Sequence, residues 1–99
     1  MEINEIVIAL TALAQASRLS VFRLLVQTGE AGLPAGKIAE ALEIPSSSLS
    51  FHLKELHHAG LIQSRQEGRF VIYSAHYARM NAVIGYLTEN CCNGQPCCP

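Results

Sequence analysis

Hydrophobic residues recur at helical spacing near both ends of the chain. The first set comprises Ile3, Ile6, Val7, Leu10 and Leu13. The second set comprises Met80, Val83, Ile84 and Leu87. Steps of three and four residues are typical of one face of an amphipathic helix. We therefore predict a first helix over about 3–13 and a last helix from His76 to about Glu89.

The segment between them predicts three shorter helices. One runs from about Ser17 to 28 and stops at Gly29, and the next covers 33–42, with Pro34 near its start. The third opens on the serine run 46–48, whose hydroxyls can cap free amides, and ends before Gly60. The turn at 43–45 is tight because the residue before a proline is pushed out of the helical region. Two short helices joined in this way predict a helix-turn-helix, whose second helix lies in the major groove of DNA.

After Gly60, Leu61 and Ile62 lead into residues 63–66, and Phe70, Ile72 and Ser74 alternate with Val71 and Tyr73. This pattern predicts two short strands at 63–66 and 70–74. Glu67 and Gly68 predict the turn between them, with Arg69 at the tip of the hairpin. The predicted fold class is mainly α with a small β-hairpin wing, a winged helix-turn-helix.

Length and composition agree with one compact domain, because 99 residues with 49% hydrophobic content can bury one core. No apolar run approaches the roughly 20 residues that a membrane span needs. The acidic Glu2 and Glu5 replace the basic start of a signal peptide, so we expect a cytoplasmic protein. No nucleophile–base pair, phosphate loop or paired carboxylates suggest an enzyme.

The net charge of −1 hides an uneven distribution. Residues 1–45 carry more acids than bases, whereas 46–79 carry four basic side chains against two acids, and also hold all four histidines. This local basic excess suits a DNA partner that is contacted by two copies of the chain.

Helical phase divides the second helix of the motif into two faces. Leu49, Leu53 and Leu56 share the inward face, with His52 beside them. The candidate DNA-binding residues are Ser46, Ser47, Ser48, Ser50, Phe51, His52, Lys54 and Arg69. Simpler roles stay open for several of them: His52 hydrogen-bonded at the core edge, Phe51 in packing, Arg69 as a solvated turn residue, and the serines as caps.

All four cysteines fall in the last nine residues: Cys91, Cys92, Cys97 and Cys98. In a cytosolic chain, such clustered thiols indicate a soft-metal or redox site rather than a disulfide framework. Adjacent side chains on a helix diverge by about 100°, so Cys91 and Cys92 can share a ligand only where the helix unwinds. Gly94 and Pro96 favour that unwinding.

Several local strings, in this order, resemble the ArsR/SmtB family of winged-helix metal-sensing repressors. They are Ala12-Leu13-Ala14 with Ser17-Arg18-Leu19, the run from Ser46 to Lys54, Ala59-Gly60-Leu61 after Leu56, and Gly68-Arg69 with Tyr73. The resemblance implies a homodimer built from the first and last helices, through Ile3, Val7, Leu10, Val83, Ile84 and Leu87. It also implies an operator with two half-sites.

The metal sites of many family members are missing from this sequence. Residues 33–42 contain no cysteine or histidine, and the last helix offers only His76 and Glu89 in place of aspartate and histidine pairs. The tail instead resembles the C-terminal arsenite site of a subset of ArsR repressors. As(III) is thiophilic and prefers three thiolates, for which Cys91, Cys92 and Cys98 are favoured and Cys97 is the alternative.

We therefore predict a winged helix-turn-helix and dimerisation domain at 1–90 and a cysteine-rich metalloid-binding tail at 91–99. The predicted function is a repressor that dissociates from operator DNA when As(III) binds; Sb(III) or methylated trivalent arsenic fits the same thiols. Alternatives are a four-thiolate zinc site, a reversible disulfide switch, and a metalloid-buffering module that binds no DNA.

Overall fold

The computed structural model describes residues 1–94, and their elements follow the predicted order with one added strand. The helices are α1 (Ile3–Leu13), α2 (Ala16–Thr28), α3 (Ala35–Leu42), α4 (Ser46–His58) and α5 (Tyr77–Thr88). The strands are β1 (Leu33–Pro34), β2 (Ile62–Glu67) and β3 (Phe70–Ala75), and a 3-10 turn, η1, covers Cys91–Gly94. These elements confirm the predicted fold class, a mainly α chain with a β-hairpin wing.

Helices α2 and α3 begin at Ala16 and Ala35 and not at about 17 and 33 as predicted, while α4 begins at Ser46 as predicted but with a different cap. The N-cap of α2 is Gln15, whose side chain accepts a hydrogen bond from the Arg18 amide at 2.8 Å, so the helix begins before Ser17. The N-cap of α4 is Pro45, which has no side-chain cap. The serine run therefore lies inside the first turn, and the prediction that it caps α4 is wrong.

The C-terminal end of α4 is as predicted. Gly60 has a φ of 78°, and its amide donates to the carbonyl of His57 at 3.0 Å. The next amide, of Leu61, donates to the carbonyl of Leu56 at 3.0 Å. This pattern ends a helix where a residue without a side chain can adopt the left-handed conformation.

The sheet has the order β1-β3-β2, all antiparallel. Glu67 pairs with Phe70, so the hairpin turn is Gly68–Arg69, one residue later than predicted. Strand β1 was not predicted, because a two-residue strand shows no alternation and Pro34 suggested a helix start; Leu33 pairs with Tyr73. Arg69 still lies at the tip.

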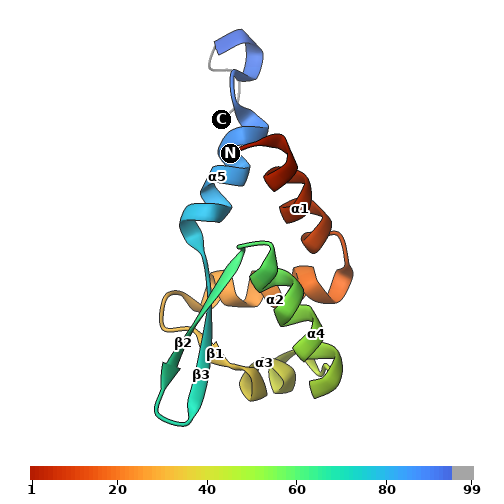
Figure 1. The fold of residues 1–99 in the computed structure, drawn as a ribbon, viewed down its shortest axis with the longest axis vertical. Helices are drawn as coiled ribbons and strands as arrows, with labels where there is room; N and C mark the ends of the chain where they lie inside the picture. Colours follow the sequence, from red (N-terminus) through yellow and green to blue (C-terminus); the bar gives the residue numbers. More distant parts are fainter. Residues whose placement is uncertain (95–99) are drawn as a thin grey trace.

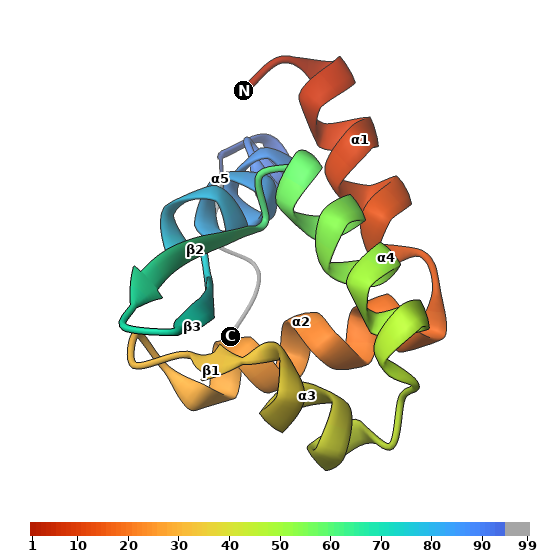
Figure 2. The same ribbon diagram turned by 60° about the horizontal axis from the view of Figure 1, so that its bottom comes forward.

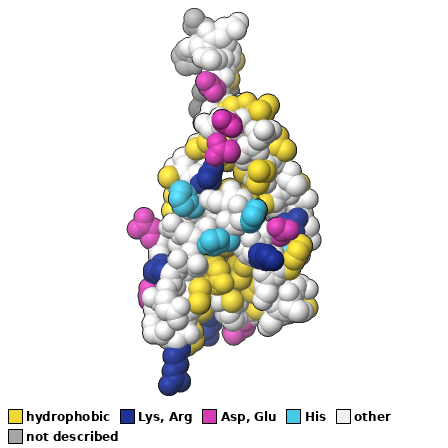
Figure 3. Space-filling view, viewed as in Figure 1, with side chains coloured by type: hydrophobic (Ala, Val, Ile, Leu, Met, Phe, Trp, Pro, Cys, Tyr) yellow, Lys and Arg dark blue, Asp and Glu magenta, His cyan; other side chains and the backbone are white. Residues whose placement is uncertain are grey.

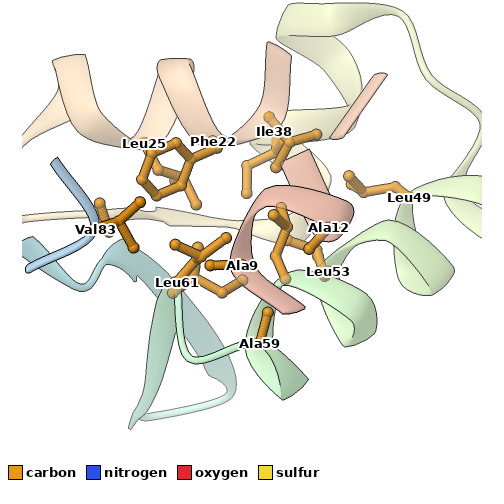
Figure 4. Packing of buried hydrophobic residues seen from close by; sticks show 14 of the residues in the cluster. Ala9, Ala12, Phe22, Leu25, Ile38, Leu49, Leu53, Ala59, Leu61 and Val83 are labelled. Atoms are coloured by element: carbon orange, nitrogen blue, oxygen red, sulfur yellow. The ribbon is translucent and has the colours of Figure 1, made fainter. Parts of the chain in front are cut away.

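The core lies where the helices meet the base of the sheet. Figure 4 shows the side chains of its members directed toward one another from α1, α2, α3, α4 and α5 and from the start of β2. The largest fully buried side chains are Leu25, Ile38, Leu49, Leu56, Leu61 and Val21. Burial of such side chains stabilises the fold by about 1.5–3 kcal/mol each.

The elements are arranged around two ends of the molecule. α1 and α5 lie together at the upper end in Figure 1, while α3, the start of α4 and the hairpin tip lie at the lower end. Figure 2 shows α4 running beside α1. Among residues 1–94, no single helix is long and apolar enough to cross a membrane. α1 and α2 reach that length only as a pair bent by 101°.

Candidate nucleic-acid interface and thiol site

Helix α4 presents a polar face to solvent because its leucines anchor the opposite face. Leu49, Leu53 and Leu56 are buried, as predicted. The exposed candidate residues on this helix are Ser46, Ser47, Ser48, Ser50, Phe51 and Lys54. This face joins hydroxyl donors, one cation and one aromatic ring, which suits contacts to phosphates and base edges. Their predicted role in DNA binding is compatible with their exposure.

His52 occupies a different position from the other candidates. The side chain is half-buried, and its Nδ1 atom is buried with no hydrogen-bond partner among residues 1–94. Its ring packs edge-on against Phe51, with centroids 6.0 Å apart, whereas Phe51 itself is 54% exposed. This burial places His52 at the core edge, so Phe51 is the better placed of the two to meet a base.

The wing is fixed to the body of the protein by Arg65. Its Nη1 and Nη2 atoms donate to the carbonyls of Glu30 at 3.1 Å and Ala31 at 2.7 Å, and its Nε pairs with Glu67. The hairpin is thus tied to the loop after α2. Sequence reasoning missed this residue because its carbonyl partners lie 34 and 35 positions away. Arg69 at the tip is exposed.

Helices α1 and α5 share an exposed apolar surface. Ile3, Val7 and Leu10 are 63%, 53% and 40% exposed, and Ile84 and Leu87 are 52% and 58% exposed. Leu10, Ile84 and Leu87 line a groove of about 440 Å³ together with other, mainly apolar side chains of α1, α2 and α5, whereas Val7 borders a separate depression between α1 and α4. Val83, which the sequence placed on this surface, is 5% exposed and belongs to the core. We call the other five residues the apolar α1–α5 face.

The first two cysteines lie close to the end of α5, after Glu89 and Asn90. The helix ends at Thr88, and Asn90, Cys92 and Asn93 have positive φ values, so the chain leaves the helical path before the thiols. The Sγ atoms of Cys91 and Cys92 lie 3.6 Å apart. Cys92 is engaged in a disulfide in this structure, so one atom can bind both sulfurs only after that bond is reduced. The predicted unwinding therefore occurs, and it begins earlier than Gly94.

The remaining thiols of the predicted site, Cys97 and Cys98, lie outside the described residues. Within residues 1–94, no group of three or more histidine, cysteine, aspartate or glutamate side chains is arranged to hold a metal ion. The set of cysteines that bind the ligand therefore stays a prediction. Of these cysteines, the structure describes Cys91 and Cys92.

The chain is similar in sequence and in fold to known transcriptional regulators. A family described as a helix-turn-helix domain matches residues 13–65. The transcriptional activator HlyU of Vibrio cholerae is 31% identical over 87% of this chain and 77% of its own length. A solved structure of HlyU superimposes with a TM-score of 0.72 at 32% identity, covering 93% of this chain and 99% of HlyU.

Two further solved structures are similar. An ArsR-like transcriptional regulator from Rhodococcus sp. RHA1 has a TM-score of 0.76 at 27% identity, covering 85% of this chain and 76% of its own. Mb0332 from Mycobacterium bovis, described as a homodimeric winged helix-turn-helix DNA-binding domain, has a TM-score of 0.70 at 24% identity. It covers 98% of this chain and 90% of its own. HlyU has also been solved in a form described as reduced, with a TM-score of 0.68 at 29% identity over 90% of each chain.

Proposed function

Since the chain belongs to the ArsR type of winged helix-turn-helix transcriptional regulators, we propose that it is an arsenite-responsive repressor. It binds operator DNA as a homodimer in the cytoplasm and leaves the DNA when As(III) binds the C-terminal cysteines. The family and its relatives are DNA-binding regulators and not enzymes. The observation that carries the proposal is the position of Cys91 and Cys92, which only Glu89 and Asn90 separate from the end of α5, a helix of the apolar α1–α5 face.

The DNA contacts come from α4 and the wing. The exposed hydroxyls of Ser47, Ser48 and Ser50 and the ammonium of Lys54 meet phosphates and base edges, with Phe51 available for a thymine methyl group. Arg69, at the hairpin tip, reaches a phosphate or the adjacent minor groove.

A second copy of the chain covers the apolar α1–α5 face. Five large hydrophobic side chains at 40–63% exposure form a patch that a single soluble chain rarely leaves open. In a two-fold dimer the same patch serves both copies. This arrangement agrees with the homodimeric description of Mb0332 and supplies two recognition helices for two half-sites.

The inducer is chemically matched to the tail. As(III) is soft and takes three thiolates. Once the disulfide at Cys92 is reduced, the vicinal pair supplies two sulfurs, which lie 3.6 Å apart in this structure. Cys98, or Cys97 in its place, supplies the third. Closing the tail around the metalloid reshapes the end of α5, which changes how the two copies pack and hence the separation of their recognition helices. A coupling of about 1–3 kcal/mol, or about 5- to 150-fold in affinity, is the usual range for such a change.

The test compares arsenite-dependent release from a fluorescent duplex taken from the promoter of the protein's own gene, in reducing buffer. Wild type and the matched control Asn93→Ser, changed between the thiols, should both be released. Cys92→Ser should stay bound. Equal release of wild type and Cys92→Ser contradicts the proposal. X-ray absorption of the loaded protein should count three sulfurs per arsenic, whereas four sulfurs around a zinc ion would support the zinc alternative.

A redox-responsive regulator of the same fold is the second candidate. The description of one HlyU structure as reduced and the disulfide in which Cys92 is engaged favour it. In this version, hydrogen peroxide oxidises two thiols to a disulfide and is itself reduced to water. Release by peroxide, reversed by dithiothreitol and insensitive to arsenite, would identify this function.

A further inference from the structure

A polar pocket of about 360 Å³ lies between α4 and the β2–β3 hairpin. Leu53 forms part of its apolar lining. The polar side chains around it are Ser50, Lys54, His57 and His58 of α4, Ser64 of β2 and Tyr73 of β3. Figure 3 shows histidine side chains gathered on this face, beside a patch of hydrophobic side chains between α4 and the hairpin. We call this cavity the helix–wing pocket.

The helix–wing pocket is lined by hydrogen-bond donors and contains no carboxylate. Its lining includes one ammonium, two imidazoles and three hydroxyls, and no aspartate or glutamate. Among residues 1–94 the ion pairs are Arg65–Glu67 and Arg79–Glu5, so Lys54 has no acidic partner there. Glu55 of α4 lines a different depression, against α1, which His58 also borders. The pocket therefore favours an anion.

The geometry of duplex DNA supplies that anion. A recognition helix lies in the major groove and a wing tip reaches the adjacent minor groove. One sugar–phosphate strand separates these two grooves, so it must cross between the helix and the wing. The helix–wing pocket lies on this line, with Ser50 and Lys54 on its reading-face side and Ser64 on its hairpin side.

We propose that the helix–wing pocket seats one phosphate of the DNA backbone in each protomer, held by Lys54 and by an imidazole of His57 or His58. The inference rests on the proposed DNA binding and extends it to residues beyond the reading face of α4. The seat fixes how deeply α4 enters the groove, independently of base sequence.

The seat makes DNA binding sensitive to pH. The titratable groups that line it are Lys54, His57 and His58 from α4 and Tyr73 from β3, while Ser64 from β2 and Ala35 from α3 are neutral. His58 also lines the depression against α1, together with Glu55 of α4 and Arg18 of α2. Imidazoles as a class gain a proton between pH 8 and 5. A proton gained there adds positive charge beside the phosphate, so affinity rises as the pH falls.

The test uses a random-sequence duplex of about 30 base pairs, about three helical turns, because a phosphate contact needs no operator. Lowering the pH from 8 to 6 should tighten binding by wild type roughly three- to tenfold and steepen its salt dependence by about one ion per protomer. In His57→Gln,His58→Gln both changes should disappear. The control His76→Gln, outside the pocket, should behave as wild type. A double variant that keeps the full pH and salt response overturns the seat.

A second measurement separates the sources of the anion. The ring resonances of His57 and His58 should shift on addition of the duplex at concentrations near that of the protein, and inorganic phosphate should reproduce the shift only in large excess. Saturation by inorganic phosphate with no response to the duplex would show a small-anion site and overturn the proposal. Neither measurement involves arsenite or the operator. A failure of the proposed phosphate site can therefore be told apart from a failure of the proposed response to arsenite.

Discussion

The guanidinium of Arg79 in α5 forms an ion pair with the carboxylate of Glu5 in α1, with Nη1 and Oε2 3.0 Å apart, although 74 positions separate the two residues. The same side chain lies against Gly60, where an added Cβ would come within 2.9 Å of its Nε. Arg79 therefore touches both helices of the apolar α1–α5 face and the residue that terminates α4. It thus connects α5 with α1 and with the C-terminal end of α4.

This ion pair predicts a pH dependence of stability. The pKa of Glu5 is lowered, first by the hydrogen bond from the backbone amide of Glu2 and then by Arg79. A lowered folded-state pKa contributes stability above the unfolded value and loses it as the pH falls through the folded value. The thermal midpoint of Glu5→Gln should therefore change less than that of wild type below about pH 4.3, the ordinary glutamate value. Parallel curves in that range would contradict the role of this carboxylate.

Replacing Gly32 with alanine should destabilise the fold by a steric clash in addition to the backbone strain of a positive φ. An added Cβ there would lie 2.4 Å from the carbonyl oxygen of Tyr73, and φ is +68°. Gly68 has a similar φ of +62° but open space around it. Gly68→Ala should cost about 1–2 kcal/mol from the left-handed backbone alone, and Gly32→Ala about 3 kcal/mol or more because backbone must move. Urea unfolding should show this difference; equal losses would mean that the sheet yields easily.

The contacts of Arg65 predict that the stability of the wing depends on the hydrogen bonds of its guanidinium and not on its positive charge. Lysine at this position keeps the charge but cannot donate to the Glu30 and Ala31 carbonyls in the same fork geometry. Arg65→Lys should lower the free energy of local opening of the hairpin by about 1–2 kcal/mol. Amide hydrogens in β2 and β3 should therefore exchange faster than in wild type. The charge-preserving control Arg69→Lys, at the exposed tip, should leave that exchange unchanged. Equal amide exchange rates in the two variants would show that the Arg65 guanidinium does not hold the wing in place.

The apolar α1–α5 face predicts that a substitution there abolishes dimerisation without unfolding the chain. Ile84 is 52% exposed in the single chain, so glutamate at this position leaves the core intact. Ile84→Glu should sediment as a folded monomer and bind DNA more weakly, because the two recognition helices are no longer coupled. Val71→Glu, at 39% exposure on β3, is the matched control and should remain dimeric. A dimeric Ile84→Glu would place the interface elsewhere.

Helix positions and the inward leucines of α4 were predictable because they depend on local periodicity. The capping role of the serines at the start of α4 was predicted wrongly, and the hairpin turn was placed one residue too early. In both places the local sequence fits more than one arrangement. Val83 was assigned to the exposed face because a helix with apolar residues over a wide arc does not reveal which of them meets the core. The roles of the eight DNA-binding candidates and the four cysteines remain predictions.

The order of the amino acids alone determined the helix-turn-helix, the hairpin and the thiol-rich tail, because each is written in spacings of a few residues. Tertiary structure decided which distant groups meet: Arg65 with the loop after α2, Arg79 with Glu5 and Gly60, and the donors of the helix–wing pocket. Such partners lie tens of residues apart, where no local pattern records them. Only the packing of the leucine core brings them together.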